Sequence, residues 1–204
     1  MYKRQDHTVD GPDAVTRAEL EHAIRAVCDL TLETEVIVFG SQAILGQFPN
    51  APDALRQSAE ADIAPKRDGA IAEQLALEID GALGLGSDFH QAHGFYVHGV
   101  PIEAATLPEG WRERTIPVRN ANTRHNTGLC VEVHDLAASK LAAFRERDRD
   151  FVRVLLLHDL VRPITLQLRL RQLPDDPADP ARQERLLTWL DRTLKELGRA
   201  GRAG

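Results

Sequence analysis

The chain has 204 residues and a formal net charge of −6. With 43% hydrophobic and 27% charged residues, it has the composition of an ordinary globular protein that buries a core. The acidic balance argues against a broad basic surface for nucleic acid and leaves room only for a local basic patch.

No stretch of the sequence approaches the roughly 18 apolar residues that span a bilayer. The residues after Met1 lack the apolar core of a signal peptide. Cys28 and Cys130 lie far apart among apolar neighbours, which favours small core residues over a disulfide framework. We therefore expect a cytoplasmic protein without membrane contact.

The first two thirds of the chain mix predicted helices and strands. Leu20, Ile24 and Val27 recur at helical spacing and predict a helix over residues 16–30. A continuous apolar run at residues 36–39 predicts a buried strand that ends at Gly40. The other elements expected here are a short helix at residues 42–46 with Ser41 as its N-cap, a strand at 60–65, a helix at 70–83, a hairpin with arms at 94–98 and 101–106, and a strand at 129–133.

The last third is predicted to be helical. Asp135 is expected to cap a helix that continues to about residue 147, and a second helix follows at about 149–160. Pro163 then separates a further short helix, and a proline- and aspartate-rich linker at residues 173–180 precedes an amphipathic last helix. The fold class that follows is α+β, with a mixed domain at residues 14–133, a C-terminal helical region at 134–198, and flexible ends at 1–13 and 199–204.

Gly40 and Ser41 join the first predicted strand to the short helix after it. Glycine lets a ligand approach the backbone closely, and a helix N-terminus offers free N–H groups and a positive dipole end. The Ser41 hydroxyl adds one more donor. This turn therefore predicts a phosphate-binding site.

Glu60 and Asp62 lie two residues apart on a predicted strand, so both carboxylates point to one face of the sheet. Two parallel carboxylates repel each other unless a cation lies between them. Mg²⁺ takes hard oxygen ligands, often one or two carboxylates together with substrate phosphates. The pair therefore predicts a metal site that faces the phosphate site.

The order of a strand, Gly40-Ser41, a helix and then Glu60-x-Asp62 resembles the polymerase-β-like nucleotidyltransferase superfamily. The closest likeness is to uncharacterised bacterial nucleotidyltransferases related to abortive-infection and type IV toxin–antitoxin toxins. It covers roughly residues 20–165, and three stretches carry it: Gly40-Ser41-Gln42-Ala43-Ile44, Leu107-Pro108-Glu109-Gly110-Trp111 and His134-Asp135-Leu136-Ala137-Ala138-Ser139-Lys140-Leu141. The resemblance implies a small mixed nucleotidyltransferase sheet flanked by helices.

The resemblance also implies further site residues. Superfamily members use a third carboxylate on a neighbouring strand, and Glu103 in the second arm of the expected hairpin is the best match. Related toxins use a lysine and an acid downstream, matched here by Lys140 and Asp148, which share a helical face with Phe144 and Arg147 at the expected spacing. The site so implied has Glu60, Asp62 and Glu103 as catalytic and metal-binding residues, and Gly40, Ser41, Lys140 and Asp148 as nucleotide-binding residues.

Each of these residues also has an ordinary structural interpretation. Glu103 on a solvated strand face and Lys140 on a helix surface need no function, and Asp148 is equally suited to capping a helix that begins near residue 149. The spacing of His90, His93 and His98 does not favour a zinc site, and we expect these histidines to line a loop or the rim of the cleft.

The function that follows is transfer of a nucleoside monophosphate from a nucleoside triphosphate, with Mg²⁺ or Mn²⁺ as cofactor. The resemblance implies an RNA acceptor, tRNA ends in particular, or a protein acceptor, and an antitoxin partner. Glu60 stands where aspartate is commoner and lies unusually far from Ser41, which keeps open a non-catalytic nucleotide-binding or antitoxin-like protein on the same fold. A modifier of small cationic molecules such as aminoglycosides is a third alternative.

Overall fold

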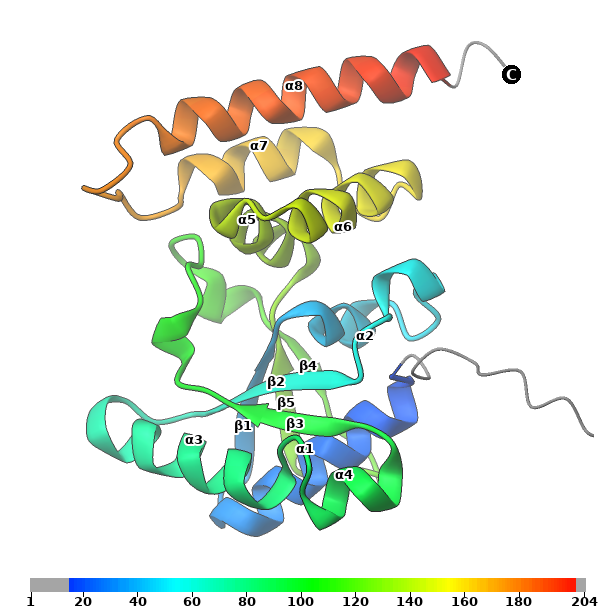
Figure 1. The fold of residues 1–204 in the computed structure, drawn as a ribbon, viewed down its shortest axis with the longest axis vertical. Coiled ribbons are helices and arrows are strands. Elements are labelled where there is room, and N and C mark those ends of the chain that lie inside the picture. Colours follow the sequence, from blue (N-terminus) through cyan, green and yellow to red (C-terminus); the bar gives the residue numbers. More distant parts are fainter. Residues whose placement is uncertain (1–14, 201–204) are drawn as a thin grey trace, which may run out of the picture.

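The structure of the protein is a computed structural model, which describes residues 15–200 (Figure 1). The expected flexible end at residues 1–13 lies outside the described residues, as do residues 201–204 of the expected flexible end at 199–204, whereas residues 199–200 belong to the last helix, Arg182–Ala200. A sheet with its flanking helices forms one part of the molecule, and a stack of helices lies over it (Figure 1). This arrangement confirms the α+β fold class.

The sheet has five strands in the order β3-β2-β1-β5-β4. β1 pairs antiparallel with β2 and parallel with β5, while β3 is parallel to β2 and β4 is antiparallel to β5. The central position of β1 explains its unbroken apolar run, because both of its faces are covered. The strands are β1 (Glu35–Phe39), β2 (Glu60–Pro65), β3 (Tyr96–Gly99), β4 (Ile116–Val118) and β5 (Thr127–Cys130).

The predicted hairpin around Gly99 is wrong. Its first arm is β3, which pairs with β2 rather than with the residues that follow it. Its second arm begins at Pro101, which cannot donate a hydrogen bond to a strand ladder, and it forms the short 3-10 helix η3 (Ile102–Ala104). The sequence pattern also misses β4, whose three residues are too few to show an alternation.

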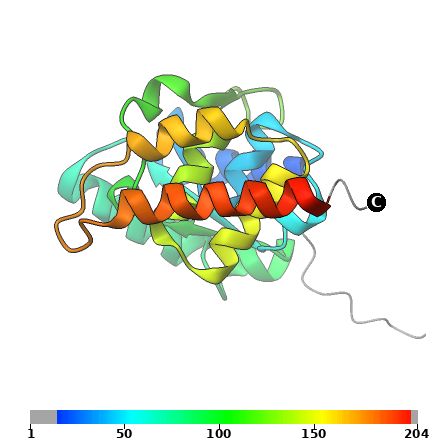
Figure 2. The same ribbon diagram turned by 90° about the horizontal axis from the view of Figure 1, so that it is seen from above.

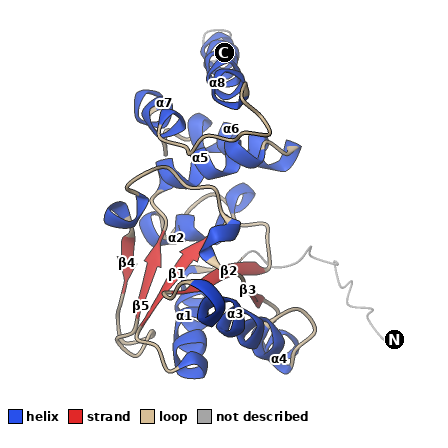
Figure 3. Cartoon of the chain, turned by 90° about the vertical axis from the view of Figure 1, so that its left-hand side faces the viewer, coloured by secondary structure: helices blue, strands red, loops and turns tan. Residues whose placement is uncertain are grey.

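The helices α1 (Arg17–Thr31), α3 (Gly69–Leu83) and α4 (Asp88–His93) pack against the sheet from one side (Figures 1 and 3). α1 begins with a capping box, in which Thr16 and Glu19 each accept a hydrogen bond from the backbone N–H of the other. α3 approaches β3 so closely that a Cβ on Gly99 would overlap the Ala76 carbonyl oxygen. This close packing fixes the position of the edge strand β3.

Four helices form the second part of the molecule: α5 (Val133–Ala143), α6 (Glu146–Leu157), α7 (Pro163–Arg171) and α8 (Arg182–Ala200). α8 is the outermost of them and crosses over the others, as Figure 2 shows from above. The N-cap of α5 is Glu132, which accepts hydrogen bonds from the backbone N–H groups of His134 and Asp135, so the predicted cap at Asp135 is wrong. The predicted helix to residue 147 is also wrong, because Phe144 adopts a left-handed conformation with a φ of 55° and ends α5.

One continuous apolar core joins the sheet to the helical stack. It includes Ile37 from β1, Leu136 from α5 and Leu186 from α8. Cys28 and Cys130 are buried free thiols in this core, as predicted, and burial raises the pKa of each to about 12. None of the described helices is long and apolar enough to cross a membrane.

Candidate active site

Gly40 brings the end of β1 into close contact with β2. Its φ of 64° and ψ of −167° form a conformation that is accessible essentially to glycine alone. A Cβ at this position would overlap Oδ2 of Asp62. The glycine is therefore required both by the backbone turn and by the carboxylate that lies against it.

The adjacent strands β2 and β3 place four polar side chains next to one another. Glu60 is paired with Tyr96, and Asp62 with His98, in the parallel register of the two strands. The Tyr96 hydroxyl donates a hydrogen bond of 2.8 Å to Oε2 of Glu60. Nδ1 of His98 lies 3.1 Å from Oδ1 of Asp62 and 3.6 Å from Oε1 of Glu60. Since residues two apart on a strand share a face, the two carboxylates converge as the sequence predicts.

The Glu60 carboxylate influences the ionisation of Asp62. Burial, with the neighbouring Glu60 carboxylate as the next cause, raises the pKa of Asp62 to about 6, although His98 acts in the opposite direction. Burial and the hydrogen bond to Glu60 raise the pKa of the Tyr96 hydroxyl to about 12. Tyr96 therefore remains a hydrogen-bond donor to Glu60 across the neutral range.

Lys140 connects the helical stack to the turn after β1. Its Nζ donates a hydrogen bond of 3.0 Å to Oγ of Ser41 and lies 3.6 Å from Oδ1 of Asp148. Burial lowers the pKa of Lys140, and the Asp148 and Asp62 carboxylates oppose that effect. The Asp148 side chain is only 1% exposed, and its Oδ2 accepts a hydrogen bond of 2.7 Å from Arg145.

Ser41 does not have its predicted role as an N-cap. It begins the 3-10 helix η1 (Ser41–Ala43), which makes no side-chain cap bond and continues into α2 (Ile44–Gln47). Two such short pieces add little helix dipole. Lys140 and the Ser41 hydroxyl are therefore the main hydrogen-bond donors that this turn could offer to an anion.

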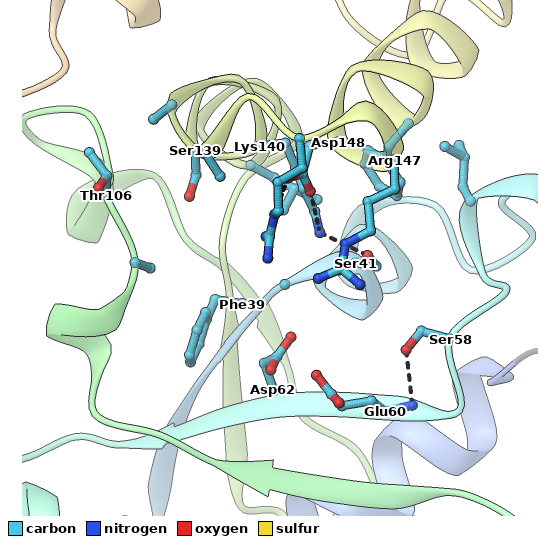
Figure 4. Close-up of a pocket in the computed structure, with 18 of the residues that line it drawn as sticks. Phe39, Ser41, Ser58, Glu60, Asp62, Thr106, Ser139, Lys140, Arg147 and Asp148 are labelled. Carbon is cyan, nitrogen blue, oxygen red and sulfur yellow. Dashed lines mark hydrogen bonds and ion pairs between the residues drawn. The ribbon is translucent and has the colours of Figure 1, made fainter. Parts of the chain in front are cut away.

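Apart from Tyr96, these groups line one cavity of about 1020 Å³ between the sheet and the helical stack. Figure 4 shows Glu60 and Asp62 on one side of it and Lys140, Arg147 and Asp148 on the other, with Ser41 between them. A volume of this size accommodates a substrate as large as a nucleotide. The structure thus brings together six of the seven predicted site residues: Gly40, Ser41, Glu60, Asp62, Lys140 and Asp148.

Glu103 is the predicted site residue that the structure does not bring to this cluster. It lies in η3, is exposed, and is not among the residues that line the cavity, whereas its neighbours Ala104 and Ala105 are. The sequence reasoning in turn missed Tyr96 and the position of His98 beside Asp62. Both contacts follow from a parallel pairing of residues 96–99 with residues 60–63, because this register sets Tyr96 beside Glu60 and His98 beside Asp62.

A divalent cation fits the cluster of Glu60, Asp62 and His98. One ligand atom of each residue lies within 4.8 Å of those of the other two, and no side chain of Lys or Arg within residues 15–200 forms an ion pair with either carboxylate. In the same cavity, Oδ1 of Asp148 is buried and has no hydrogen-bond partner among the described residues. Glu60 and Asp62, which have no Lys or Arg partner among the described residues, favour a bound cation. Oδ1 of Asp148, which is paired with Lys140 but accepts no hydrogen bond from the described residues, favours a ligand that carries a hydrogen-bond donor.

Comparison with known proteins shows the family of the chain. The family model "Nucleotidyltransferase of unknown function (DUF6036)" matches residues 18–171, which is more than half of the 204-residue chain. This range contains every residue of the cluster described above. No curated protein and no solved structure matches the chain.

Proposed function

Since the chain belongs to the DUF6036 family of nucleotidyltransferases, we propose that it transfers a nucleoside monophosphate from a nucleoside triphosphate to a hydroxyl group of an RNA or protein acceptor. In this reaction the acceptor oxygen forms a bond to the α-phosphorus, the bond to pyrophosphate breaks, and the acceptor proton passes to solvent. The observation that carries the proposal is the convergence of Glu60 and Asp62 with Ser41 and Lys140 on one cavity.

Glu60 and Asp62 would hold the divalent cation, whose chemistry is to neutralise and orient the triphosphate. Tyr96 orients Glu60 through its hydrogen bond and leaves Oε1 of that carboxylate on the side of His98. Phosphoryl-type transfer needs positioning and charge neutralisation more than covalent help from the protein. In the proposed reaction, the carboxylates on β2 would position the cation, and the cation would neutralise charge on the triphosphate.

Lys140 and Ser41 would bind the triphosphate from the opposite wall of the cavity. Lys140 is a compact point charge that suits phosphate oxygens, and it already lies within hydrogen-bond distance of Ser41. Asp148, with one buried oxygen free of hydrogen bonds within the described part of the chain, would accept one from the nucleoside. These roles of Gly40, Ser41, Lys140 and Asp148 belong to the proposal.

Arginines on the helical side of the cavity support RNA as the acceptor. Arg145, Arg147 and Arg182 all line it, although the chain as a whole carries a net charge of −6. A local basic group at the active site binds phosphates of an RNA end without a basic surface elsewhere. An RNA-modifying toxin controlled by an antitoxin protein is the biological setting we propose.

The second candidate function is a protein that binds nucleotides without turnover. The specific observation in its favour is that two carboxylates, rather than three, converge here, because Glu103 is exposed in η3. Such a protein would bind a triphosphate with heat released in calorimetry and would produce no pyrophosphate.

The test is incubation of the protein with each labelled triphosphate, a divalent cation and total cellular RNA or protein. We expect label to be transferred to one acceptor class, pyrophosphate to be released, and both signals to be lost in Asp62→Ala. Asp191→Ala, an exposed acid on α8, is the matched control and should behave as the parent. Transfer that is equal in the parent and in Asp62→Ala, or absent with every triphosphate and acceptor, would contradict the proposal.

A further inference from the structure

The edge strand β3 contributes the imidazole of His98 to the cluster that also contains Glu60 and Asp62. His98 is paired with Asp62 in the parallel register and lies on the same face of the sheet as Glu60 and Asp62. Its Nδ1 is the ring atom directed at both carboxylates, at 3.1 Å from Asp62 and 3.6 Å from Glu60. Its side chain is 43% exposed, so the ring also remains open to the cavity that it lines.

We propose that His98 is the third protein ligand of the cation and that this makes the site selective for Mn²⁺ over Mg²⁺. The inference rests on the proposed function, since it concerns the same metal centre. It replaces the expected ligand Glu103, which lies in η3 outside the cluster.

The physical reason is the identity of the donor atoms. Mg²⁺ prefers oxygen ligands and rigid octahedral geometry, whereas imidazole nitrogen favours transition metals. Two carboxylates and a neutral imidazole also carry one negative charge less than three carboxylates. The change from a carboxylate to a histidine therefore weakens the electrostatic attraction for Mg²⁺ and adds a nitrogen donor. Mn²⁺ binds most weakly in the affinity order of first-row divalent metals, but as a transition metal it accepts imidazole nitrogen more readily than Mg²⁺ does.

The neighbouring contacts agree with a ligand role. The Tyr96 hydroxyl binds Oε2 of Glu60, which leaves Oε1, the atom nearer to His98, for the cation. Hydrogen bonds that orient a ligating carboxylate are a general feature of metal sites. In the same cavity, Oδ1 of Asp148 is buried and pairs with Lys140 at 3.6 Å but accepts no hydrogen bond from the described residues, so it could accept one from a ligand of this site.

A purely positioning role of His98 makes a different prediction. In that case His98 only donates a hydrogen bond to Asp62, and its removal would weaken Mg²⁺ and Mn²⁺ binding by the same factor. As a ligand, His98 contributes to Mn²⁺ binding specifically. The ratio of the two dissociation constants therefore separates the two roles.

The experiment measures Mn²⁺ binding by electron paramagnetic resonance and Mg²⁺ by competition, on the full chain without nucleotide. We expect His98→Asn, which keeps an amide nitrogen at the position of Nδ1, to raise the Mn²⁺ dissociation constant at least about tenfold, the lower end of what outer-shell partners of metal ligands cost. Its Mg²⁺ binding should change far less. His98→Asp, which creates three carboxylates, should shift the preference towards Mg²⁺.

A spectroscopic signature accompanies these affinities. Mn²⁺ bound to the parent should show coupling to a ¹⁴N nucleus in pulsed spectra, and the coupling should disappear in His98→Asn and His98→Asp. His158→Ala is the matched control, because His158 is exposed at the end of α6 and does not line the cavity.

The possible outcomes separate the inference from the proposed function. An unchanged ratio of Mn²⁺ to Mg²⁺ affinity in both His98 variants, or a ¹⁴N coupling that survives them, overturns the inference even when the parent transfers nucleotides. Loss of the coupling and of the Mn²⁺ preference supports the inference even when no transfer is found, which would then count against the proposed function alone.

Discussion

Lys140 on α5 donates a hydrogen bond of 3.0 Å to Oγ of Ser41, 99 residues earlier in the chain. The two residues belong to the helical stack and to the turn after β1, so this bond joins the two walls of the cavity. Phe151 lies beneath the ammonium group, with Nζ 5.3 Å from the ring centroid. Lys140 is thus held at the turn by three neighbours: Ser41, Asp148 and Phe151.

Lys140→Met should weaken triphosphate binding. Methionine fills a similar volume but removes the charge, and a hydrogen bond to a charged group contributes about 1.5–3 kcal/mol. We therefore expect KM for the triphosphate to rise by roughly 10- to 100-fold. Lys195→Met is the control, because Lys195 is an exposed lysine that pairs with Asp191 on α8. A KM that remains within a factor of two of the parent would show that Lys140 does not bind the triphosphate.

Gly40→Ala should disturb both the backbone and the metal site. The left-handed φ of Gly40 predicts a loss of about 1–3 kcal/mol in the free energy of unfolding, and the added Cβ must displace the Asp62 carboxylate. Urea unfolding and Mn²⁺ titration measure the two effects separately.

Gly69 provides a matched control for that substitution. It also has a positive φ, of 62°, but a Cβ there meets no atom within 4 Å. Gly69→Ala should therefore lower stability and leave Mn²⁺ binding unchanged. Equal Mn²⁺ affinities in Gly40→Ala and Gly69→Ala would mean that Gly40 has no specific effect on Asp62.

Asp62→Asn should stabilise the metal-free protein above about pH 6. Because the pKa of Asp62, about 6, lies above its ordinary value of 3.8, the folded state holds this proton more tightly than the unfolded chain does. The resulting stabilisation is complete below pH 3.8 and is lost as the pH rises through 6. Asparagine mimics the neutral carboxyl at every pH. The free energy of unfolding of Asp62→Asn should therefore exceed that of the parent by an amount that grows across this window to at most about 3 kcal/mol.

Denaturant unfolding between pH 4 and pH 8 measures this difference. Asp191→Asn, which changes an exposed aspartate on α8, serves as the control. Saturating Mn²⁺ should remove the advantage of Asp62→Asn, because a cation that binds the folded parent stabilises it by mass action. An advantage of Asp62→Asn that is the same at pH 4 and pH 8 would contradict the raised pKa.

The parts of the site that the sequence predicts are those set by local pattern. β2 begins and ends as expected at Glu60 and Pro65, and the two-residue period of a strand alone brings Glu60 and Asp62 to one face. The glycine before Ser41 is likewise a local requirement of the turn. These features need no knowledge of the tertiary fold.

The parts that the sequence does not predict depend on pairing between distant segments. His98 reaches Asp62 only because β3 adds to the edge of β2 in parallel, a choice that no residue within 94–106 reveals. Lys140 and Asp148 do meet, but across the break at Phe144 between α5 and α6 rather than along one helix. A left-handed phenylalanine is not a recognisable helix end in a sequence, because glycine normally has that role.

Asp135 is the residue whose loss should most damage the connection between the two parts of the molecule. Its carboxylate is fully buried and pairs with Arg114, at 2.8 Å, and with Arg169 on α7, at 3.0 Å. Arg114 ends η4 (Trp111–Arg114), so the ion pairs join α5 and α7 to the loop region beside the sheet. Removing one partner of a buried ion pair leaves uncompensated charge in the interior.

We expect Asp135→Ala to lower the free energy of unfolding by about 3–5 kcal/mol. The exposed pair of Asp191 and Lys195 is the control, since Asp191→Ala should change the free energy of unfolding by less than about 1 kcal/mol. Asp135 does not line the cavity, so the fraction of Asp135→Ala that remains folded at low temperature should keep the Mn²⁺ affinity of the parent. Comparable urea midpoints for the two variants would show that the ion pairs of Asp135 with Arg114 and Arg169 do not stabilise the junction.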